Sequence, residues 1–382
     1  MLLWKIWILD INHYGVVHVK ILLMISPKDY EYDLPPELIA QKPAVPRDNS
    51  RLFIYNTKTD EIIFDYFYNL VRYLPKNSFL VLNNTKVLPS RTTLKKETGG
   101  GVVMLFLVNE QMNEGSCRII VDRKVKTGDK LYFSNGDYIL ITAQNEVLFT
   151  VQMSFPRTHL YRLLEADGTM PIPPYIKHSP LSRNQLKDSY QTIFADIQGS
   201  SAAPTASLHF TERVFRDLEA AQIPKIYTTL HVGMGTFAPV TEKNLAEKTL
   251  HHEWYEISKE ALRCIDTSKY AGKELVAVGT TVVRTLESWK VKGQNSKVKT
   301  ETQKSKSNRV MDSTNLFIMP PYRFQVIDHL ITNFHIPGSS LMMLVEAFLQ
   351  DRKAKRSLIQ PYTIAIKEKF RFYSFGDVML IL

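Results

Sequence analysis

The chain has 382 residues, 44% of them hydrophobic, and a formal net charge of +10, which together predict a globular protein with one large and one smaller domain. The positive charge favours a polyanionic partner such as RNA, although charge alone does not establish one. Cys117 and Cys264 lack metal-ligand spacing, so we expect reduced thiols of a cytoplasmic protein and no structural zinc.

The N-terminal segment is apolar but is not predicted to enter a membrane. Asp10, Asn12 and two histidines interrupt residues 1–26, so no run of about 18 to 20 apolar residues remains, and no small-residue cleavage pattern follows. We treat residues 1–23 as an N-terminal extension and hypothesise that translation begins at Met24. N-terminal mass spectrometry of the native protein would test this.

Residues 78–153 change to short runs of β-forming residues, separated by Gly, Asn and Asp. Ser134-Asn-Gly is a strong signal for a hairpin turn. The six runs, FLVLNN, VVMLFLV, CRIIVDR, DKLYF, DYILITA and EVLFTVQM, predict a small β-barrel or sandwich. Strands alternate with helices on either side, so we expect an all-β domain at 73–153 inserted into an α/β domain of residues 24–72 and 154–382.

Residues 199–211, GSSAAPTASLHFT, bring small side chains and His209 together just before a predicted helix. Pro204 restricts one φ angle, and Thr211 is placed to cap the helix. The absence of bulk would let a ligand approach the backbone closely. The alternative is a tightly packed turn between a strand and a helix.

Three later strands also end in polar loops. Residues 225–230 lead into His231 and a glycine-rich stretch. Residues 275–278 precede Gly279-Thr280-Thr281 and a helix whose free N–H groups suit an anion. Residues 330–340 place His335 before the next helix.

Residues 290–309 contain few apolar side chains and many Lys, Ser, Thr and Gln. This composition predicts a solvated, mobile basic loop within the α/β domain. It would be either an arm that holds RNA or a solubilising insertion, and the second is favoured because charge runs are usually just solvated.

Together these segments resemble one family, the S-adenosylmethionine:tRNA ribosyltransferase-isomerases of queuosine biosynthesis. The resemblance extends from about Tyr32 to Asp377, with its pieces in the family's order. Besides the loops above, the pieces are YDLPPELIAQ (32–41), PRDNSR (46–51), NNTKVLPSR (83–91), MPIPPYI (170–176), YQT (190–192) and RFYSFGD (371–377). The resemblance implies a distorted β/α barrel that carries an inserted β-barrel.

The family's reaction moves the ribosyl part of S-adenosylmethionine to the aminomethyl group of 7-aminomethyl-7-deazaguanine at the tRNA wobble position. The sugar becomes an epoxycyclopentanediol, and adenine and methionine leave. The resemblance thus implies S-adenosylmethionine as co-substrate, this tRNA as partner, and no metal or other cofactor. We expect a cytoplasmic monomer that does not bind membranes.

This chemistry requires removal of a proton beside the sulfonium and attack by a neutral amine. We predict that His209 and His231 lie near the reacting sugar and that Glu253 is the base. Each histidine could instead be structural, and Glu253 could be a surface or salt-bridged residue. His252 is a further candidate.

The predicted substrate-binding residues are polar side chains of the same loops. Arg284 would hold the methionine carboxylate, unless it pairs with Glu287 on its own helix. The remaining candidates are Thr205, Thr280, Thr281, Asn333 and His335. Arg91 is the favoured RNA contact among Arg47, Arg51, Lys86, Arg91, Arg371 and Tyr373.

The chain departs from the family's usual residues at Val103, Lys248 and Pro321. These departures leave open a paralogue that uses S-adenosylmethionine on another acceptor. The positive charge leaves open a catalytically silent tRNA-binding module. Retention of the loops with His209, His231, Glu253 and His335 argues against the silent module.

Overall fold

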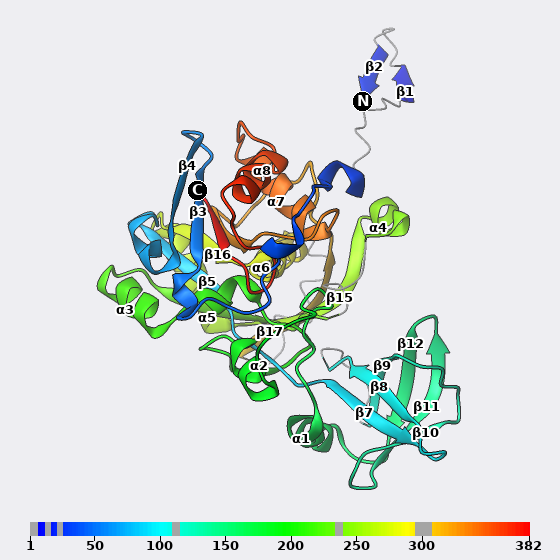
Figure 1. Cartoon of the computed structure of the whole chain (residues 1–382). Helices are drawn as coiled ribbons and strands as arrows, with labels where there is room; N and C mark the ends of the chain where they lie inside the picture. Colours follow the sequence, from blue (N-terminus) through cyan, green and yellow to red (C-terminus); the bar gives the residue numbers. More distant parts are fainter. Residues whose placement is uncertain (1–6, 12–16, 21–25, 109–114, 234–239, 295–307) are drawn as a thin grey trace.

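The computed structural model describes residues 7–11, 17–20, 26–108, 115–233, 240–294 and 308–382. Figure 1 shows a large α/β domain, a small β-barrel beside it, and the N-terminal pair β1 (Trp7–Ile11) and β2 (Val17–Lys20) standing apart from both. Most of the predicted basic loop, residues 295–307, lies outside the described residues. The predicted bounds, 290–309, are too wide at both ends, because residues 290–294 continue a helix and Arg309 begins a strand.

The large domain is built on a 9-stranded mixed sheet. Its order is β17 (Arg309–Leu316), β15 (Thr249–Ser258), β14 (Lys225–Leu230), β5 (Ser78–Asn83), β16 (Glu274–Val278), β18 (His329–Asn333), β19 (Val378–Ile381), β3 (Arg51–Asn56) and β4 (Glu61–Tyr66). Strands β14, β5, β16 and β18 are parallel to one another. Their carboxyl ends therefore meet at one edge of the sheet, which we call the carboxyl edge.

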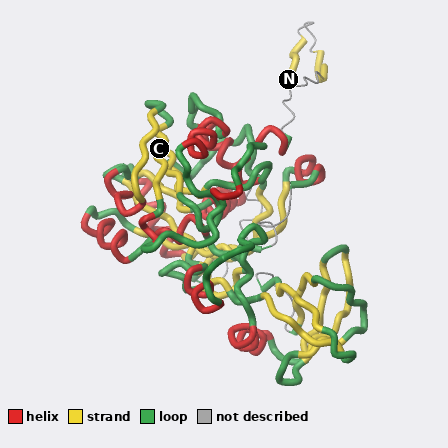
Figure 2. Tube along the Cα trace, in the orientation of Figure 1, coloured by secondary structure: helices red, strands yellow, loops and turns green. Residues whose placement is uncertain are grey.

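Helices cover both faces of this sheet, as the red and yellow layers of Figure 2 show. In β5, Phe79 and Val81 pack with the core that includes α5 (Lys259–Tyr270), α6 (Thr280–Gln294), α7 (Ser340–Asp351) and α8 (Ile359–Lys367). Leu80 and Leu82 point the other way, toward α3 (Glu212–Ala220). Every β5 residue is buried, as expected for a central strand covered on both faces.

The small domain is a closed antiparallel barrel of six strands. In barrel order they are β10 (Lys130–Tyr132), β11 (Tyr138–Asn145), β12 (Leu148–Met153), β9 (Ser116–Val121), β8 (Gly101–Phe106) and β7 (Arg91–Lys96). Alternate side chains such as Leu94, Val102 and Met104 fill its interior. The expected α/β class with an inserted all-β barrel is confirmed.

One predicted barrel strand belongs elsewhere. Residues 78–83, expected as the first strand of the small domain, form β5 in the middle of the large sheet. The barrel instead begins at β7, whose residues alternate between exposed and buried. The apolar run FLVL has no such alternation, and that lack is typical of a strand buried on both faces.

Short elements join the two domains. Strands β6 (Thr85–Val87) and β13 (Ile197–Ser200) form a parallel pair, and α1 (Arg157–Asp167) packs Leu160 and Leu164 into the barrel core. The remaining helices are α2 (Arg183–Ser189) and α4 (Glu242–Glu247). Within the described part of the chain, no helix has both the length and the apolar character needed to cross a membrane.

Candidate functional site

The carboxyl edge gathers most of the predicted site residues. His231 follows β14, Thr85 lies just after β5, and Thr280 begins the helix that follows β16. Asn333 ends β18. In open α/β sheets, ligands bind outside the carboxyl ends of the parallel strands, so this edge is the candidate site.

Asn333 connects three loops at the β18 end of this edge. Its side-chain oxygen accepts a hydrogen bond from Thr205 Oγ1 at 2.8 Å, and its Nδ2 lies 3.3 Å from His209 Nε2. The same Nδ2 donates to the backbone carbonyl of Tyr373 at 3.4 Å. The structure therefore brings together Thr205, His209 and Asn333, which the sequence had offered as candidates on separate loops.

His209 is held on both sides by the protein. Its Nε2 faces the Asn333 amide, and it also makes a hydrogen bond to the backbone of Arg47. Burial, followed by the charges of Arg371 and Arg47, lowers the pKa of His209 to about 3. The ring is neutral and only 4% exposed, which supports the tightly packed alternative for this loop.

His335 is similarly enclosed. Its Nε2 lies 2.7 Å from Thr332 Oγ1, and its backbone N–H donates to the hydroxyl of Tyr362 at 2.9 Å. The backbone carbonyl of His335 accepts a hydrogen bond from Tyr32. Burial lowers the pKa of His335 to about 3. The residue anchors a cluster of aromatic side chains, and its predicted substrate contact stays a prediction.

His231 differs from these two histidines because it borders a cavity. Its Nδ1 lies 2.8 Å from Thr85 Oγ1. The ring lies against Gly199, where an added Cβ would come within 3.0 Å of ring atoms Cε1 and Nε2. Gly199 also has a φ of +145°, so a glycine is required there on two counts. Burial and then Arg157 lower the pKa of His231 to about 4.

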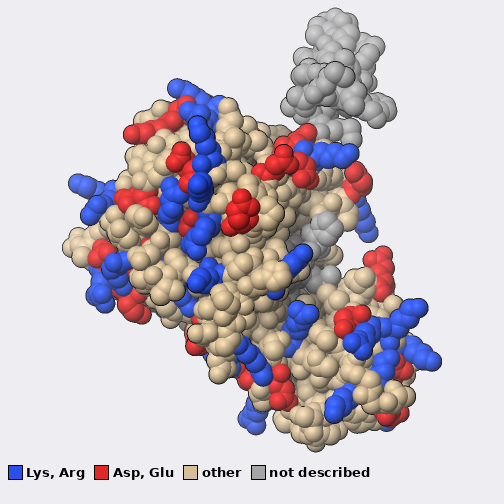
Figure 3. All heavy atoms as spheres, viewed as in Figure 1, with Lys and Arg blue, Asp and Glu red and all other residues tan. Residues whose placement is uncertain are grey.

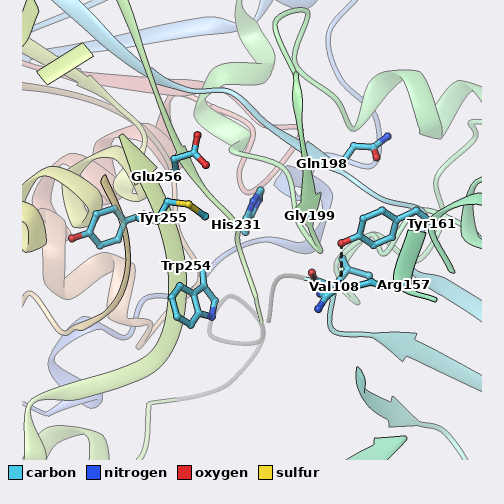
Figure 4. A pocket seen from close by; sticks show the side chains of 10 residues that line it. Val108, Arg157, Tyr161, Gln198, Gly199, His231, Trp254, Tyr255 and Glu256 are labelled. Carbon is cyan, nitrogen blue, oxygen red and sulfur yellow. Dashed lines mark hydrogen bonds between the residues drawn. The ribbon is translucent and has the colours of Figure 1, made fainter. Parts of the chain in front are cut away.

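The cavity beside His231 lies between the two domains and has a volume of about 160 Å³. Figure 4 shows Trp254, Tyr255 and Glu256 of β15 on one side of the ring, with Tyr161 and Arg157 of α1 on the other. The remaining lining residues are Val108, Gln198, Gly199 and Met311. We call this space the interdomain pocket.

Among the lining residues, sequence reasoning had named only His231 as a site residue. Arg157 and Tyr161 are one helical turn apart, and Arg157 Nε donates to the Tyr161 hydroxyl at 3.2 Å. Their i, i+4 spacing is a readable signal that they share a helix face. Nothing in that spacing indicates that the face meets β15, which lies almost 100 residues further along the chain.

Glu253 and Arg284 form a buried ion pair. Arg284 Nη1 donates to Glu253 Oε2, and Gly233 N–H donates to Glu253 Oε1 at 3.0 Å. Glu253 is 2% exposed and Arg284 is 7% exposed. The salt-bridged alternative for Glu253 therefore describes this structure.

The alternative pairing of Arg284 with Glu287 is wrong. Glu287 accepts hydrogen bonds from the backbone N–H groups of Gln325 and Val326 and from the Tyr322 hydroxyl. Burial raises the pKa of Glu287. Glu287 thus binds the loop before β18, and Arg284 pairs instead with Glu253 on β15.

The turn before α6 allows a neighbouring loop to pack closely against it. Gly279 has a φ of +90°, and an added Cβ there would lie 3.7 Å from the Cβ of Ala206. The loop with Thr205 thus packs onto the start of α6. Thr281 Oγ1 is buried and has no hydrogen-bond partner among the described residues. Thr280 and Thr281 lie in the first turn of α6, and their predicted contact with the substrate stays a prediction.

Arg91 lies away from this edge, at the start of β7. It is exposed and borders a second cavity of about 420 Å³ with Asp167 and Thr169. His252 is also exposed, 3.2 Å from Ser313 Oγ. Neither Arg91 nor His252 therefore lies with Asn333 and its partners at the carboxyl edge.

The three residues that depart from the family's usual pattern do not line the interdomain pocket. Val103 is in barrel strand β8, Lys248 ends α4 with a φ of 53°, and Pro321 follows a cis peptide bond. In the described ranges, no three His, Cys, Asp or Glu side chains are grouped so as to hold a metal ion.

Comparison with known proteins identifies the relatives of this chain. The model of the family described as "Queuosine biosynthesis protein" matches residues 27–381. The S-adenosylmethionine:tRNA ribosyltransferase-isomerase of Thermoanaerobacter sp. (strain X514) is 39% identical over 361 residues, covering 93% of this chain and 99% of the relative. The protein of the same name from Carboxydothermus hydrogenoformans is 41% identical over 360 residues, with the same coverage.

A solved structure agrees with these relatives. The crystal structure of S-adenosylmethionine tRNA ribosyltransferase from Thermotoga maritima is similar with a TM-score of 0.50 and 30% sequence identity. The match covers 93% of this chain and 100% of that chain. Sequence and structure lead to one family, and the chain belongs to the queuosine biosynthesis protein family.

Proposed function

We propose that this protein is an S-adenosylmethionine:tRNA ribosyltransferase-isomerase. It would transfer and isomerise the ribosyl part of S-adenosylmethionine onto 7-aminomethyl-7-deazaguanine at the tRNA wobble position, with release of adenine and methionine. The observation that carries the proposal is the match to relatives of this name at about 40% identity over 99% of their length. The histidine and polar side chains at the carboxyl edge are of the kinds that this reaction requires.

His231 is the residue we assign to proton removal beside the sulfonium. Its lowered pKa keeps the ring neutral, and a neutral imidazole can accept a proton. Thr85 fixes the ring at Nδ1, while Nε2 has no hydrogen-bond partner among the described residues. His231 thus replaces Glu253 as the proposed base.

Glu253 is assigned a positioning role instead. Its carboxylate is already neutralised by Arg284 and accepts a hydrogen bond from Gly233 N–H. Breaking a buried ion pair leaves an uncompensated charge in the interior. Glu253 therefore positions Arg284 and Gly233 rather than acting on the substrate.

The start of α6 is the proposed site for the methionine carboxylate. N–H groups at a helix N-terminus attract anions, and Thr281 Oγ1 can add a further hydrogen bond. Thr205 lies on the loop that packs there, with Asn333 fixing its hydroxyl. His209 and His335 lie buried beside Asn333 and Thr332, and their contact with the substrate stays a prediction.

The proposal includes partners and cofactors. The protein would act as a cytoplasmic monomer on tRNA, since its substrate resides in the cytoplasm, and would need no metal. Light scattering during gel filtration tests the oligomeric state. Dialysis against a chelator should leave the rate unchanged, and restoration of a lost rate by one divalent ion on tRNA folded beforehand would contradict this.

One assay tests the reaction itself. The protein is incubated with labelled S-adenosylmethionine and tRNA carrying the aminomethyl base, and released adenine is measured. Adenine release that depends on this tRNA supports the proposal. Release without the tRNA would indicate a paralogue with another acceptor, and tRNA binding without release would indicate a silent module.

The affinity for tRNA should fall steeply with salt. Each phosphate neutralised by Lys or Arg releases counterions, so log affinity declines linearly with log salt. A flat dependence between low and physiological salt would contradict tRNA binding. Deleting residues 295–307 should change KM for tRNA little if that segment only solubilises the chain.

A further inference from the structure

A pair of stacked tyrosines, with Tyr66 exposed and Tyr68 half-buried, lies outside the site described above. The rings of Tyr66 and Tyr68 are 5.4 Å apart between centroids and only 4° from parallel. Tyr66 ends the edge strand β4 and is 45% exposed. One face of the Tyr66 ring is covered by Tyr68, and much of the rest of the side chain is open to solvent.

The pair is held in place by charged residues beneath it. The Arg213 guanidinium lies 4.5 Å from the centroid of the Tyr68 ring. Arg213 Nε in turn donates to the buried carboxylate of Asp48 at 2.9 Å, and Thr211 Oγ1 donates to the same oxygen at 2.6 Å. Binding to a surface that is already ordered costs less conformational entropy.

The tyrosine pair lies at the same edge of the sheet as the candidate site. The strand registers place Asn333 opposite Val378, Val378 opposite Leu52, and Tyr66 opposite Arg51, the residue before Leu52. Three strand spacings of about 4.8 Å separate β18 from β4, so Tyr66 lies about 14 Å along the edge from Asn333. A few nucleotides of a polynucleotide bound at the site would reach it.

The surroundings are basic and aromatic. Arg51, opposite Tyr66, holds its guanidinium 3.8 Å from the centroid of Phe370, and neighbouring Phe64 is 39% exposed. Figure 3 shows many Lys and Arg side chains, with some Asp and Glu side chains among them, over the part of the large domain that holds β3 and β4 in Figure 1. Cations beside exposed aromatic rings suit a strand that presents both phosphates and bases.

We infer that Tyr66 and Tyr68 form a stacking platform for an unpaired base of the tRNA substrate, next to the base that reacts. This inference rests on the proposed function, because it places the same RNA along the same edge. Single-stranded RNA is bound by stacking its bases on aromatic side chains while Lys and Arg contact the backbone. Arg51 would supply the backbone contact.

The test measures tRNA binding separately from turnover. Fluorescence anisotropy gives Kd for labelled tRNA with wild type and with Tyr66→Ala, Tyr66→Leu and Tyr66→Phe. Tyr66→Ala and Tyr66→Leu should weaken binding by about tenfold, and Tyr66→Phe should bind like wild type, because only the flat ring is needed. KM for S-adenosylmethionine should not change.

The matched control is Tyr270→Ala. Tyr270 is 96% exposed and ends α5, just before the amino end of β16, so it lies toward the opposite edge of the sheet. Its loss should leave Kd unchanged. Thermal unfolding of each variant shows whether the fold is intact.

The outcomes separate this inference from the proposed function. If Tyr66→Leu binds tRNA as tightly as wild type, the platform is refuted even when adenine release is normal. If wild type binds tRNA but releases no adenine, the proposed reaction fails and the Tyr66 comparison still decides the platform. A loss of affinity with Tyr66→Phe equal to that with Tyr66→Ala would also overturn stacking.

Discussion

His209 and His231 lie on loops that look alike in the sequence but differ in their surroundings. His209 is 4% exposed, and its ring bonds to Asn333 and to the Arg47 backbone. His231 is fixed by Thr85 at one nitrogen and borders the interdomain pocket. Both rings are kept neutral by burial. Access to a cavity, not the loop pattern or the lowered pKa, is what separates the ring that we propose to react from the ring that the protein encloses.

The largest effect is expected for His231→Ala. Loss of a general base typically lowers kcat by about 10² to 10⁴. The residue is only half-buried, so the melting temperature should change little. Adenine release and thermal unfolding are measured together. A normal kcat in this variant would show that His231 is not the base, and the proposed difference in role between His231 and His209 would be lost.

Glu253→Gln should destabilise the fold by about 3–5 kcal/mol, because Arg284 would be left buried without its charge partner. Chemical unfolding measures this. The double variant Glu253→Gln with Arg284→Met removes both charges and should recover part of the loss. Normal stability with a strongly reduced kcat would instead restore Glu253 as the base.

His209→Ala should lower stability by about 1–3 kcal/mol, because the Asn333 amide loses a buried hydrogen-bond partner. The rate measured on the folded fraction should fall far less than for His231→Ala. Thermal unfolding and single-turnover rates test this. A loss of rate equal to that of His231→Ala, with the fold intact, would place both rings at the reacting atoms.

Gly199→Ala should lower kcat by roughly tenfold, or about 1.4 kcal/mol, because the added Cβ displaces the His231 ring. Gly100→Ala is the matched control, since an added Cβ there meets nothing within 4 Å. Steady-state kinetics of both variants measure the difference. Equal rates for the two would show that the orientation of His231 does not matter.

Acid should destabilise the protein gradually. His209 and His231 have folded pKa values of about 3 and 4, below the usual 6.5, so the unfolded chain binds more protons between these values. The free energy of unfolding should therefore fall as the pH drops from about 6.5 toward 4, by at most about 1.4 kcal/mol per pH unit for each ring. His209→Gln should flatten this slope, and exposed His252→Gln should not.

The local features of this protein could be predicted from its sequence. The six-strand barrel was predicted with five of its strands correct, because alternating β-forming runs and turns are local patterns. The polar loops at the carboxyl edge were predicted for the same reason, since each follows a recognisable strand. The segments in family order led to the family that the comparisons identify.

Contacts between residues far apart in the chain could not be predicted in this way, because they depend on how the elements pack. Strand β5 belongs to the large sheet because its uninterrupted apolar run needs cover on both faces. Glu253 and Arg284 form an ion pair although they are 31 positions apart in the chain. Arg157 and Trp254 both line the interdomain pocket. Local patterns specify strands, helices and turns, but the environment of a side chain depends on which elements pack against it. That packing left the His231 ring beside a cavity and enclosed the His209 ring in the core.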